Sequence, residues 1–328
     1  MRVMLLREVF TGDRRLELLV LLWLGSVGRH CIVPDPLESD ERAEWERALD
    51  DDTRRLWREM IDDSILREQY EPARHEIALT NGRDPAWERP TPLVPVGLAL
   101  DLLLQPYRIL LENSVYDRAF VLALCGRAER LALEEAERRA WLVFEMGGGS
   151  MVVPRVREIQ RSPSLRRMAS ALIDSDAMRP RGADEHASVV EGKQAREVRE
   201  AAGDPEVDGV HHHVLRRRSI ENYIPVVALR RWAANPDKER VVRAFEKMSD
   251  AQRHHYNLKG GFNADAPNAA RAGDLYSPLS ANARGRLAQG FGKEIAKLFA
   301  RTVKEEDLDA EAREEVREFV SEVLARMR

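Results

Sequence analysis

Two short apolar runs in the middle of the chain each end in acidic residues. Residues 109–111 are followed at once by Glu112, and residues 168–173, which are mostly apolar, are followed by Asp174 and Asp176. A short apolar run bounded by polar residues is typical of a buried strand in a parallel sheet, and such sheets bind ligands beyond the carboxyl ends of their strands. The two aspartates project to the same side of an extended chain because side chains alternate with a period of two. The pattern therefore predicts three carboxylates at one sheet edge, an arrangement that favours a hard divalent cation with oxygen ligands.

The segment around these runs alternates between predicted strands and predicted helices. A third strand is expected over residues 142–145, and the glycines at 147–149 indicate a tight turn after it. Helices are expected over residues 117–126, 127–140 and 152–161, and a further strand over residues 210–215. This alternation is typical of parallel βαβ units. Residues 98–235 are therefore expected to form an α/β domain.

The two ends of the chain are expected to be helical additions to that domain. In residues 1–97, the apolar run at 18–24 is interpreted as a core element and residues 37–70 have the spacing of amphipathic helices. Residues 71–97 contain several prolines and are interpreted as loop. Residues 236–328 are expected to be a helical C-terminal region. The predicted fold class is thus α/β, with a parallel sheet flanked by helices and helical N-terminal and C-terminal regions.

Composition and charge narrow the classes of partner. The 328 residues carry a net charge of −4, which gives no global signal for nucleic-acid binding, so such a surface has to be a local basic patch. The consecutive Arg216, Arg217 and Arg218 are the expected patch, placed to bind backbone phosphates. The run at 18–24 is far shorter than the about 20 residues that span a bilayer, and two distant cysteines favour a reducing compartment. We therefore expect a cytoplasmic protein without a membrane partner.

The order of the predicted strand endings resembles that of a known domain. A strand ending in Glu112, a second ending in a glycine turn and a third ending in Asp174 and Asp176 resemble the Toprim domain of topoisomerases, bacterial primases and the nucleases of the OLD (overcoming lysogenisation defect) group. The resemblance covers residues 107–176. The segment containing Glu221, Asn222 and Tyr223 is similar to Toprim-type nucleases of phage-defence systems and extends the resemblance to about residue 232. Asn113 stands where the family usually has a glycine after the glutamate.

The resemblance implies a Toprim-like sheet that carries a metal-dependent nuclease site. Glu112 is then the Toprim glutamate, and Asp174 and Asp176 are the metal aspartates. Glu221 and Asp117 are candidates for further acids, with Glu221 as an auxiliary catalytic group and Asp117 as a metal ligand. The cofactor is expected to be Mg²⁺ or Mn²⁺, and Lys259 is expected to stabilise the pentavalent phosphate.

The function predicted from these residues is phosphodiester hydrolysis of DNA or RNA, as a hydrolase in anti-phage defence with an ATPase or another defence protein as a partner. One alternative is a non-catalytic Toprim-like module that binds nucleic acid or a partner ATPase. A second is an α/β enzyme that acts on a nucleotide or a phosphorylated small molecule at the same sheet edge. The histidines at 211–213 are interpreted as ordinary strand residues, because consecutive strand residues point to alternate faces and do not chelate one ion together.

Overall fold

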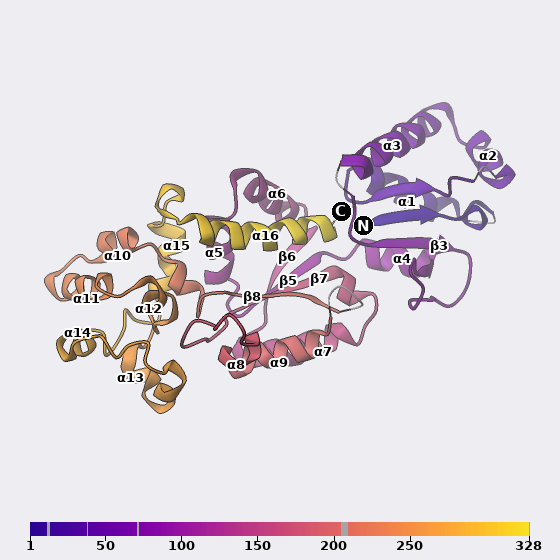
Figure 1. The fold of residues 1–328 in the computed structure, drawn as a ribbon. Helices are drawn as coiled ribbons and strands as arrows, with labels where there is room; N and C mark the ends of the chain where they lie inside the picture. Colours follow the sequence, from indigo (N-terminus) through magenta and orange to yellow (C-terminus); the bar gives the residue numbers. More distant parts are fainter. Residues whose placement is uncertain (12–13, 38, 71, 205–208, 328) are drawn as a thin grey trace.

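The computed structural model describes residues 1–11, 14–37, 39–70, 72–204 and 209–327. It contains two four-stranded parallel sheets, one near the N-terminus and one in the middle of the chain, each flanked by helices (Figure 1). The predicted α/β class is therefore confirmed, although the sequence pattern indicated only one sheet. Among the described residues, none of the helices combines the length and apolar character needed to cross a bilayer.

The first sheet corrects the expectation of a mainly helical N-terminal region. Its strands are β1 (Arg2–Leu5), β2 (Cys31–Pro34), β3 (Glu76–Thr80) and β4 (Leu93–Pro95), in the order β2-β1-β3-β4. The helices around it are α1 (Arg15–Ser26), α2 (Asp40–Arg47), α3 (Asp51–Tyr70) and α4 (Val96–Leu103). These strands have three to five residues each. Runs this short do not show a period of two, and β3 and β4 lie in the proline-rich segment interpreted as loop.

The second sheet follows the predicted pattern closely. Its strands are β5 (Tyr107–Leu111), β6 (Leu142–Met146), β7 (Ala169–Ile173) and β8 (His211–Val214), in the order β6-β5-β7-β8. The helices α5 (Tyr116–Leu124), α6 (Arg127–Arg138) and α16 (Ala310–Met327) cover one face, and α7 (Val152–Gln160) and α9 (Lys193–Ala202) cover the other (Figure 1). Side chains of β5 alternate between the two cores: Ile109 and Leu111 pack with α5, whereas Leu110 packs with α7 and α9.

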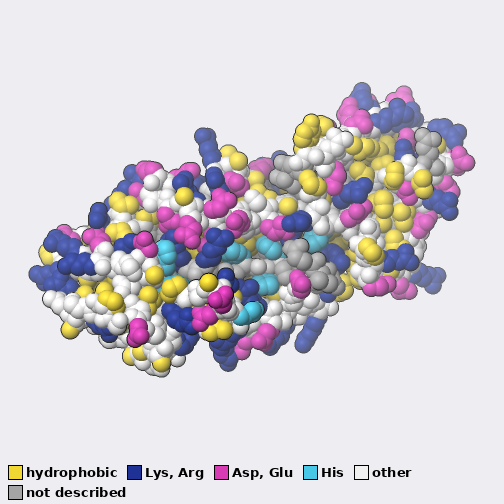
Figure 2. All heavy atoms as spheres, in the orientation of Figure 1, with side chains coloured by type: hydrophobic (Ala, Val, Ile, Leu, Met, Phe, Trp, Pro, Cys, Tyr) yellow, Lys and Arg dark blue, Asp and Glu magenta, His cyan; other side chains and the backbone are white. Residues whose placement is uncertain are grey.

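The remaining helices lie beyond the carboxyl edge of the second sheet. They are α8 (Ala187–Val190), α10 (Val226–Trp232), α11 (Pro236–Glu246), α12 (Asp250–His255), α13 (Gly261–Asp265), α14 (Ala281–Arg286) and α15 (Leu298–Arg301), with short 3-10 turns that include η4 (Ile220–Tyr223) and η5 (Ala266–Ala272). The helix α16 runs along the second sheet towards the first (Figure 1). Its end reaches the first sheet, where the amino group of Met1 donates to the carbonyl of Met327 at 3.3 Å. Basic and acidic side chains are interspersed over the face shown in Figure 2, as the small net charge suggests.

Candidate functional site

The strand order of the second sheet creates a crevice at its carboxyl edge. Strands β5 and β7 are neighbours, but the chain leaves them for opposite sides of the sheet, since β5 leads to β6 at one edge and β7 leads to β8 at the other. In doubly wound sheets, ligands bind at such a switch point, outside the carboxyl ends of the strands. Leu110 of β5 pairs with Ala171 of β7, so Glu112 and Asp174 leave the sheet at nearly the same level. The structure thus brings the predicted acids to the switch point.

Lys259 lies among these acids and contacts two of them. Its Nζ atom is 3.1 Å from Oε1 of Glu221 and 3.9 Å from Oδ2 of Asp174. The other oxygen of Asp174, Oδ1, accepts a hydrogen bond from the backbone N–H of Ile220 at 3.0 Å. That bond ties the end of β7 to the 3-10 turn η4, which carries Glu221. The ammonium therefore sits between acids from two different segments of the chain.

Glu221 is the most enclosed acid of the site. Its residue is 1% exposed, and its Oε2 atom has no hydrogen-bond partner among the described residues. A buried carboxylate oxygen without a partner costs free energy, and such atoms are rare in folded proteins. The Oε2 atom can therefore accept a hydrogen bond from a donor group of a ligand.

Asp176 is held in an unusual backbone conformation. Its φ angle is +50°, which places it in the left-handed region that few residues other than glycine, asparagine and aspartate adopt. Its backbone N–H donates to the carbonyl of Arg218 at 2.8 Å, and its side chain is exposed at the edge. Gly192 lies against it so closely that a Cβ atom there would be 2.4 Å from the Cβ of Asp176. The turn after β7 is thus built to present this one carboxylate.

The loop after Glu112 explains why Asn113 is found there. The Oδ1 atom of Asn113 accepts from the backbone N–H groups of Val115 and Tyr116, at 3.0 and 3.1 Å. Its own backbone N–H donates to Oδ2 of Asp117 at 2.9 Å. Asn113 therefore satisfies donors at the start of α5, as an asparagine does in an Asx turn. Asp117 is buried below the acids and closes this loop, so its hydrogen bonding is structural.

Burial raises the pKa values of the acids at this edge, and repulsion between carboxylates adds to the rise for Glu112, Asp117 and Asp174. Burial raises the pKa of Glu112 to about 7, with further contributions from the charges of Asp176 and Asp117. Burial and the neighbouring carboxylates of Glu112 and Glu221 hold the pKa of Asp174 well above its ordinary range. Burial likewise raises the pKa of Asp117 to about 6. Desolvation by the surrounding protein also raises the pKa of Asp176, against the lowering effect of the charges of Arg218 and Lys259. Burial disfavours the Lys259 ammonium, but the charges of Glu221 and Asp174 outweigh it and raise the lysine pKa.

The fit of a metal ion to these side chains is partial. Within the described ranges, no group of three or more His, Cys, Asp or Glu side chains is arranged so that it could hold a metal ion. The expected convergence of Glu112, Asp174 and Asp176 on a single ion is therefore not seen. The donors are nevertheless all carboxylate oxygens, and Mg²⁺ is commonly held by one or two carboxylates with water in its other positions. Asp174 and Glu112 at the end of neighbouring strands are the residues that would hold it, with Asp176 beside them.

Two of the three arginines expected to bind phosphates have other roles. Arg217 is 8% exposed, pairs with Asp309 at 2.8 Å and lies over the ring of Tyr223. Arg218 forms two hydrogen bonds with Asp265, at 2.6 and 2.7 Å. Both side chains are thus used in ion pairs, with Arg218 in a nearly buried pair and Arg217 paired with a half-exposed carboxylate. Phosphate binding by these two arginines remains a prediction. Their acidic partners lie far along the chain and gave no signal in the local sequence.

Arg216 belongs to a different basic cluster. It is exposed, pairs with Glu318 at 2.7 Å and lines a cavity of about 320 Å³ next to the Asp176 turn. Arg179, Arg181 and Arg199 line the same cavity. Arg179 and Arg199 pair with glutamates, whereas Arg181 is exposed and forms no ion pair within the described part of the chain. Sequence reasoning missed this cluster because its members are spread over nearly forty residues and meet only through the turn after β7.

The histidines and glycines near the edge are structural, as interpreted. His211 accepts or donates a hydrogen bond with Ser170 at 2.8 Å and stacks on Phe319, and His213 contacts Glu315 at 2.9 Å. The backbone N–H of Gly147 donates to the carbonyl of Leu111 at 2.6 Å. The glycine run is thus a tight connection from β6 to α7, and it places its backbone directly beside the end of β5.

Comparison of the chain with protein-family models, with curated proteins and with solved structures gives no match.

Proposed function

We propose that the carboxyl edge of the second sheet is a Toprim-like site for metal-dependent hydrolysis of phosphodiester bonds in DNA or RNA. The observation that carries the proposal is the contact of Lys259 with Asp174 and Glu221 at the switch point of a parallel sheet, with Glu112 at the end of the neighbouring strand. Perturbed acids in such a crevice are typical of functional sites. The donor set and the sheet edge support a divalent cation, Mg²⁺ or Mn²⁺, as the cofactor.

Each residue has a role that follows from its surroundings. A bound Mg²⁺ would polarise the phosphodiester and lower the pKa of an attacking water. Asp174 and Glu112 would hold that ion, and Asp176, at the exposed end of the turn, would complete its surroundings. Lys259 donates to a phosphate oxygen as negative charge develops there. Glu221 orients Lys259 through Oε1 and has Oε2 free to accept a proton.

The arginine cavity gives the proposal a binding surface. Arg179, Arg181, Arg199 and Arg216 line a cavity together with Ser175 and Ala177 of the Asp176 turn. Arg181 has no ion pair among the described residues, whereas a phosphate would compete with glutamates for the other three. Arginine binds phosphate oxygens with two parallel hydrogen bonds, and such contacts position the backbone without reading its sequence. Two buried cysteines without a disulfide fit a reducing compartment such as the cytoplasm. A role in phage defence with a partner ATPase follows from the resemblance alone.

A non-catalytic module is the second candidate, and the position of Lys259 favours it. A lysine that neutralises Asp174 and Glu221 directly gives the acidic cluster a counter-charge without any metal. In that case the edge stabilises the fold, and the arginine cavity binds nucleic acid or a protein partner without cutting.

Cleavage assays separate the two candidates. Plasmid, single-stranded DNA and RNA are incubated with Mg²⁺ or Mn²⁺ and either the native protein or Asp174→Asn. We expect the substitution to reduce cleavage by at least about a hundredfold, as loss of a group that organises transition-state charge does, while nucleic-acid affinity remains. Asp184→Asn, an exposed acid in the loop after the site, is the matched control and should cut normally. Equal cutting by Asp174→Asn would overturn the catalytic assignment, and binding without cutting by any variant would favour the non-catalytic module.

Metal binding has a readout that does not require activity. A ligand that binds only the folded protein stabilises it by about 2.7 kcal/mol at a hundredfold excess over its dissociation constant. We expect Mg²⁺ or Mn²⁺ to raise the melting temperature of the native protein and to raise that of Asp174→Asn much less. A melting temperature that millimolar metal leaves unchanged would count against a metal site at this edge.

A further inference from the structure

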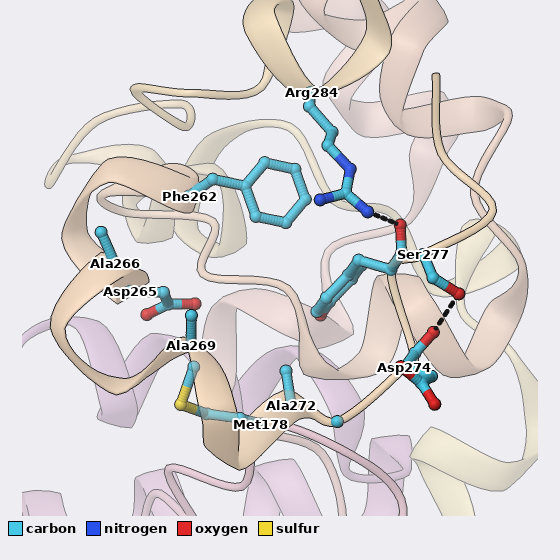
Figure 3. Close-up of a pocket in the computed structure, with 11 residues that line it drawn as sticks. Met178, Phe262, Asp265, Ala266, Ala269, Ala272, Asp274, Ser277 and Arg284 are labelled. Atoms are coloured by element: carbon cyan, nitrogen blue, oxygen red, sulfur yellow. Dashed lines mark hydrogen bonds between the residues drawn. The ribbon is translucent and has the colours of Figure 1, made fainter. Parts of the chain in front are cut away.

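A cavity of about 500 Å³ lies beyond the turn that carries Asp176, between α13, η5 and α14 (Figure 3). Its two sides differ in character. Phe262, Ala266 and Met178 lie around one part of the cavity, with the Asp265 carboxylate among them, and Ser277 and Asp274 lie on the opposite side (Figure 3). The guanidinium of Arg284 lies beside the Phe262 ring (Figure 3). Cavities of this size with an apolar side and a few polar groups are typical of small-ligand sites. The shape and lining fit a flat ring with a polar rim.

The cavity is connected to the acidic edge by direct contacts. Met178, which lines it, is two residues beyond Asp176. Arg271 of η5 donates to the carbonyl of Asp176 at 3.2 Å. Arg218, whose carbonyl accepts from the N–H of Asp176, is paired with Asp265 in the cavity wall. A group bound in the cavity therefore lies next to the segment that presents the Asp176 carboxylate.

Two polar side chains of the cavity retain hydrogen-bonding capacity. Arg284 donates one N–H to the carbonyl of Tyr276 at 2.5 Å, which leaves its remaining donors for a ligand. The carboxylate of Asp274 forms no hydrogen bond or ion pair with the described residues, and Ser277 bonds only to its backbone carbonyl. Asp265 differs, since Arg218 and Asn257 already use its oxygens. Arg284 and Asp274 are thus a free donor and a free acceptor that line the cavity.

We propose that this cavity binds one unstacked nucleobase of the nucleic acid whose backbone reaches the acidic edge. The inference extends the proposed function and rests on it, because it assigns the substrate of that site. Every base has a π-face that stacks on an aromatic ring such as Phe262. Every base also has ring or carbonyl acceptors that arginine recognises and amino or imino donors that a carboxylate accepts, which matches Arg284 and Asp274. A base enters such a cavity only when it is unpaired, so the substrate is single-stranded, or opened locally, at the bound nucleotide.

The experiment compares strands with and without bases. Binding of a labelled single-stranded oligonucleotide, and of a strand of the same length made of abasic sites, is followed by fluorescence anisotropy. We use the native protein, Phe262→Leu, Arg284→Gln and the control Arg286→Gln, which changes an exposed arginine of the same helix outside the cavity. Phe262→Leu and Arg284→Gln are each expected to weaken binding of the strand with bases by roughly tenfold, the size of one stacked base. Binding of the abasic strand, and all binding by Arg286→Gln, should be unchanged.

The outcomes separate this inference from the nuclease assignment. Equal affinity of the native protein for the two strands, or equal losses for both strands in Phe262→Leu and Arg284→Gln, would overturn the nucleobase site. Arg284 is exposed, so Arg284→Gln remains informative even if Phe262→Leu disturbs the fold, which its melting curve reports. If Asp174→Asn abolishes cleavage while bases make no difference to binding, only the nucleobase site fails. If bases matter but no protein cuts any strand, the nucleobase site stands and the nuclease assignment fails.

Discussion

The two sheets of this protein have the same strand order but very different carboxyl edges. In each, the second strand along the chain lies outside the first, and the third and fourth follow on the other side. In the first sheet, the 3-10 turn η1 (Arg7–Phe10) covers this edge directly after β1, and Phe10 packs against Trp45 and Trp57. The hydroxyl of Thr80 donates to Glu8 at 2.5 Å. This edge is filled by aromatic packing and by hydrogen bonds that pair its polar groups.

At its carboxyl edge, the second sheet has several carboxylates of like charge, whereas the first sheet has packed aromatic rings. Its edge carries five acids around Lys259, and burial raises the pKa of four of them, with repulsion between the carboxylates adding to the rise for Glu112, Asp117 and Asp174. Both strand orders therefore create a position for a ligand at the carboxyl edge of the sheet. The side chains determine whether that edge is filled by packed rings or lined by acids. Unfavourable clusters of this kind are found most often at functional sites, which is why the proposal places the site at the second sheet.

Removal of the lysine should have the largest effect on stability. Lys259→Met leaves Asp174 and Glu221 without their cation, and breaking a fully buried pair costs about 3–5 kcal/mol. The side chain of Lys259 is 44% exposed, so solvent screening reduces the expected loss to about 2–3 kcal/mol. Urea unfolding at neutral pH measures this loss. The control Lys293→Met, at an exposed position outside the site, should change stability little; similar losses in both variants would mean that the acidic cluster has no special need of Lys259.

The pH dependence of stability should identify the second sheet as the strained one. In the folded protein, Glu112 keeps its proton up to a pKa of about 7, whereas its ordinary value is 4.5. The folded state therefore binds more protons between these values, and the free energy of unfolding falls as pH rises from about 4.5 to about 7. Glu112→Gln removes this part of the dependence, so it should gain on the order of 2 kcal/mol relative to the native protein at pH 8 and nothing at pH 4.

Urea titrations at several pH values, without divalent metal, measure this difference. The same slope in the native protein and in Glu112→Gln would show that Glu112 does not carry the strain.

The smallest effect is expected at the edge of the first sheet. Thr80→Val keeps the shape of the side chain but removes its hydrogen bonds with Glu8 and with the N–H of Gly82. The cost should be about 1 kcal/mol, the usual contribution of a neutral hydrogen bond. Nucleic-acid cleavage should be unchanged. A loss of cleavage in a folded Thr80→Val protein would mean that the first sheet takes part in the reaction and that the contrast between the two edges is wrong.

The sequence was sufficient for the second sheet and its acids because those strands combine several independent signals. The apolar run before Glu112 and the run before Asp174 are buried on both faces, and each ends in charge, so length, hydrophobicity and boundaries agree. Strands of the first sheet are shorter, and β4 has only three residues, of which the last is Pro95. Their pairing partners, not their own composition, make them strands, and pairing is not readable from one local segment.

Long-range ion pairs were the other feature that local patterns did not contain. Three adjacent arginines look alike in a sequence, yet Arg216 is exposed, Arg217 is buried and Arg218 is paired with Asp265. Local sequence also did not show the contacts of Lys259. We expected this lysine to stabilise a phosphate, and no local pattern indicated that it contacts Glu221 and Asp174 directly. Which charges meet is decided by tertiary packing over dozens of residues.

The left-handed backbone at Asp176 restricts how this position can change in evolution. Glycine, asparagine and aspartate adopt φ near +50° at little cost, whereas glutamate and other longer residues are strained there. The position can therefore lose its charge by a change to asparagine that leaves the turn intact, but it cannot lengthen its carboxylate as easily. Relatives that keep this turn are therefore expected to carry Asp, Asn or Gly at residue 176, and those with Asn or Gly would lack the carboxylate that the proposed metal site uses.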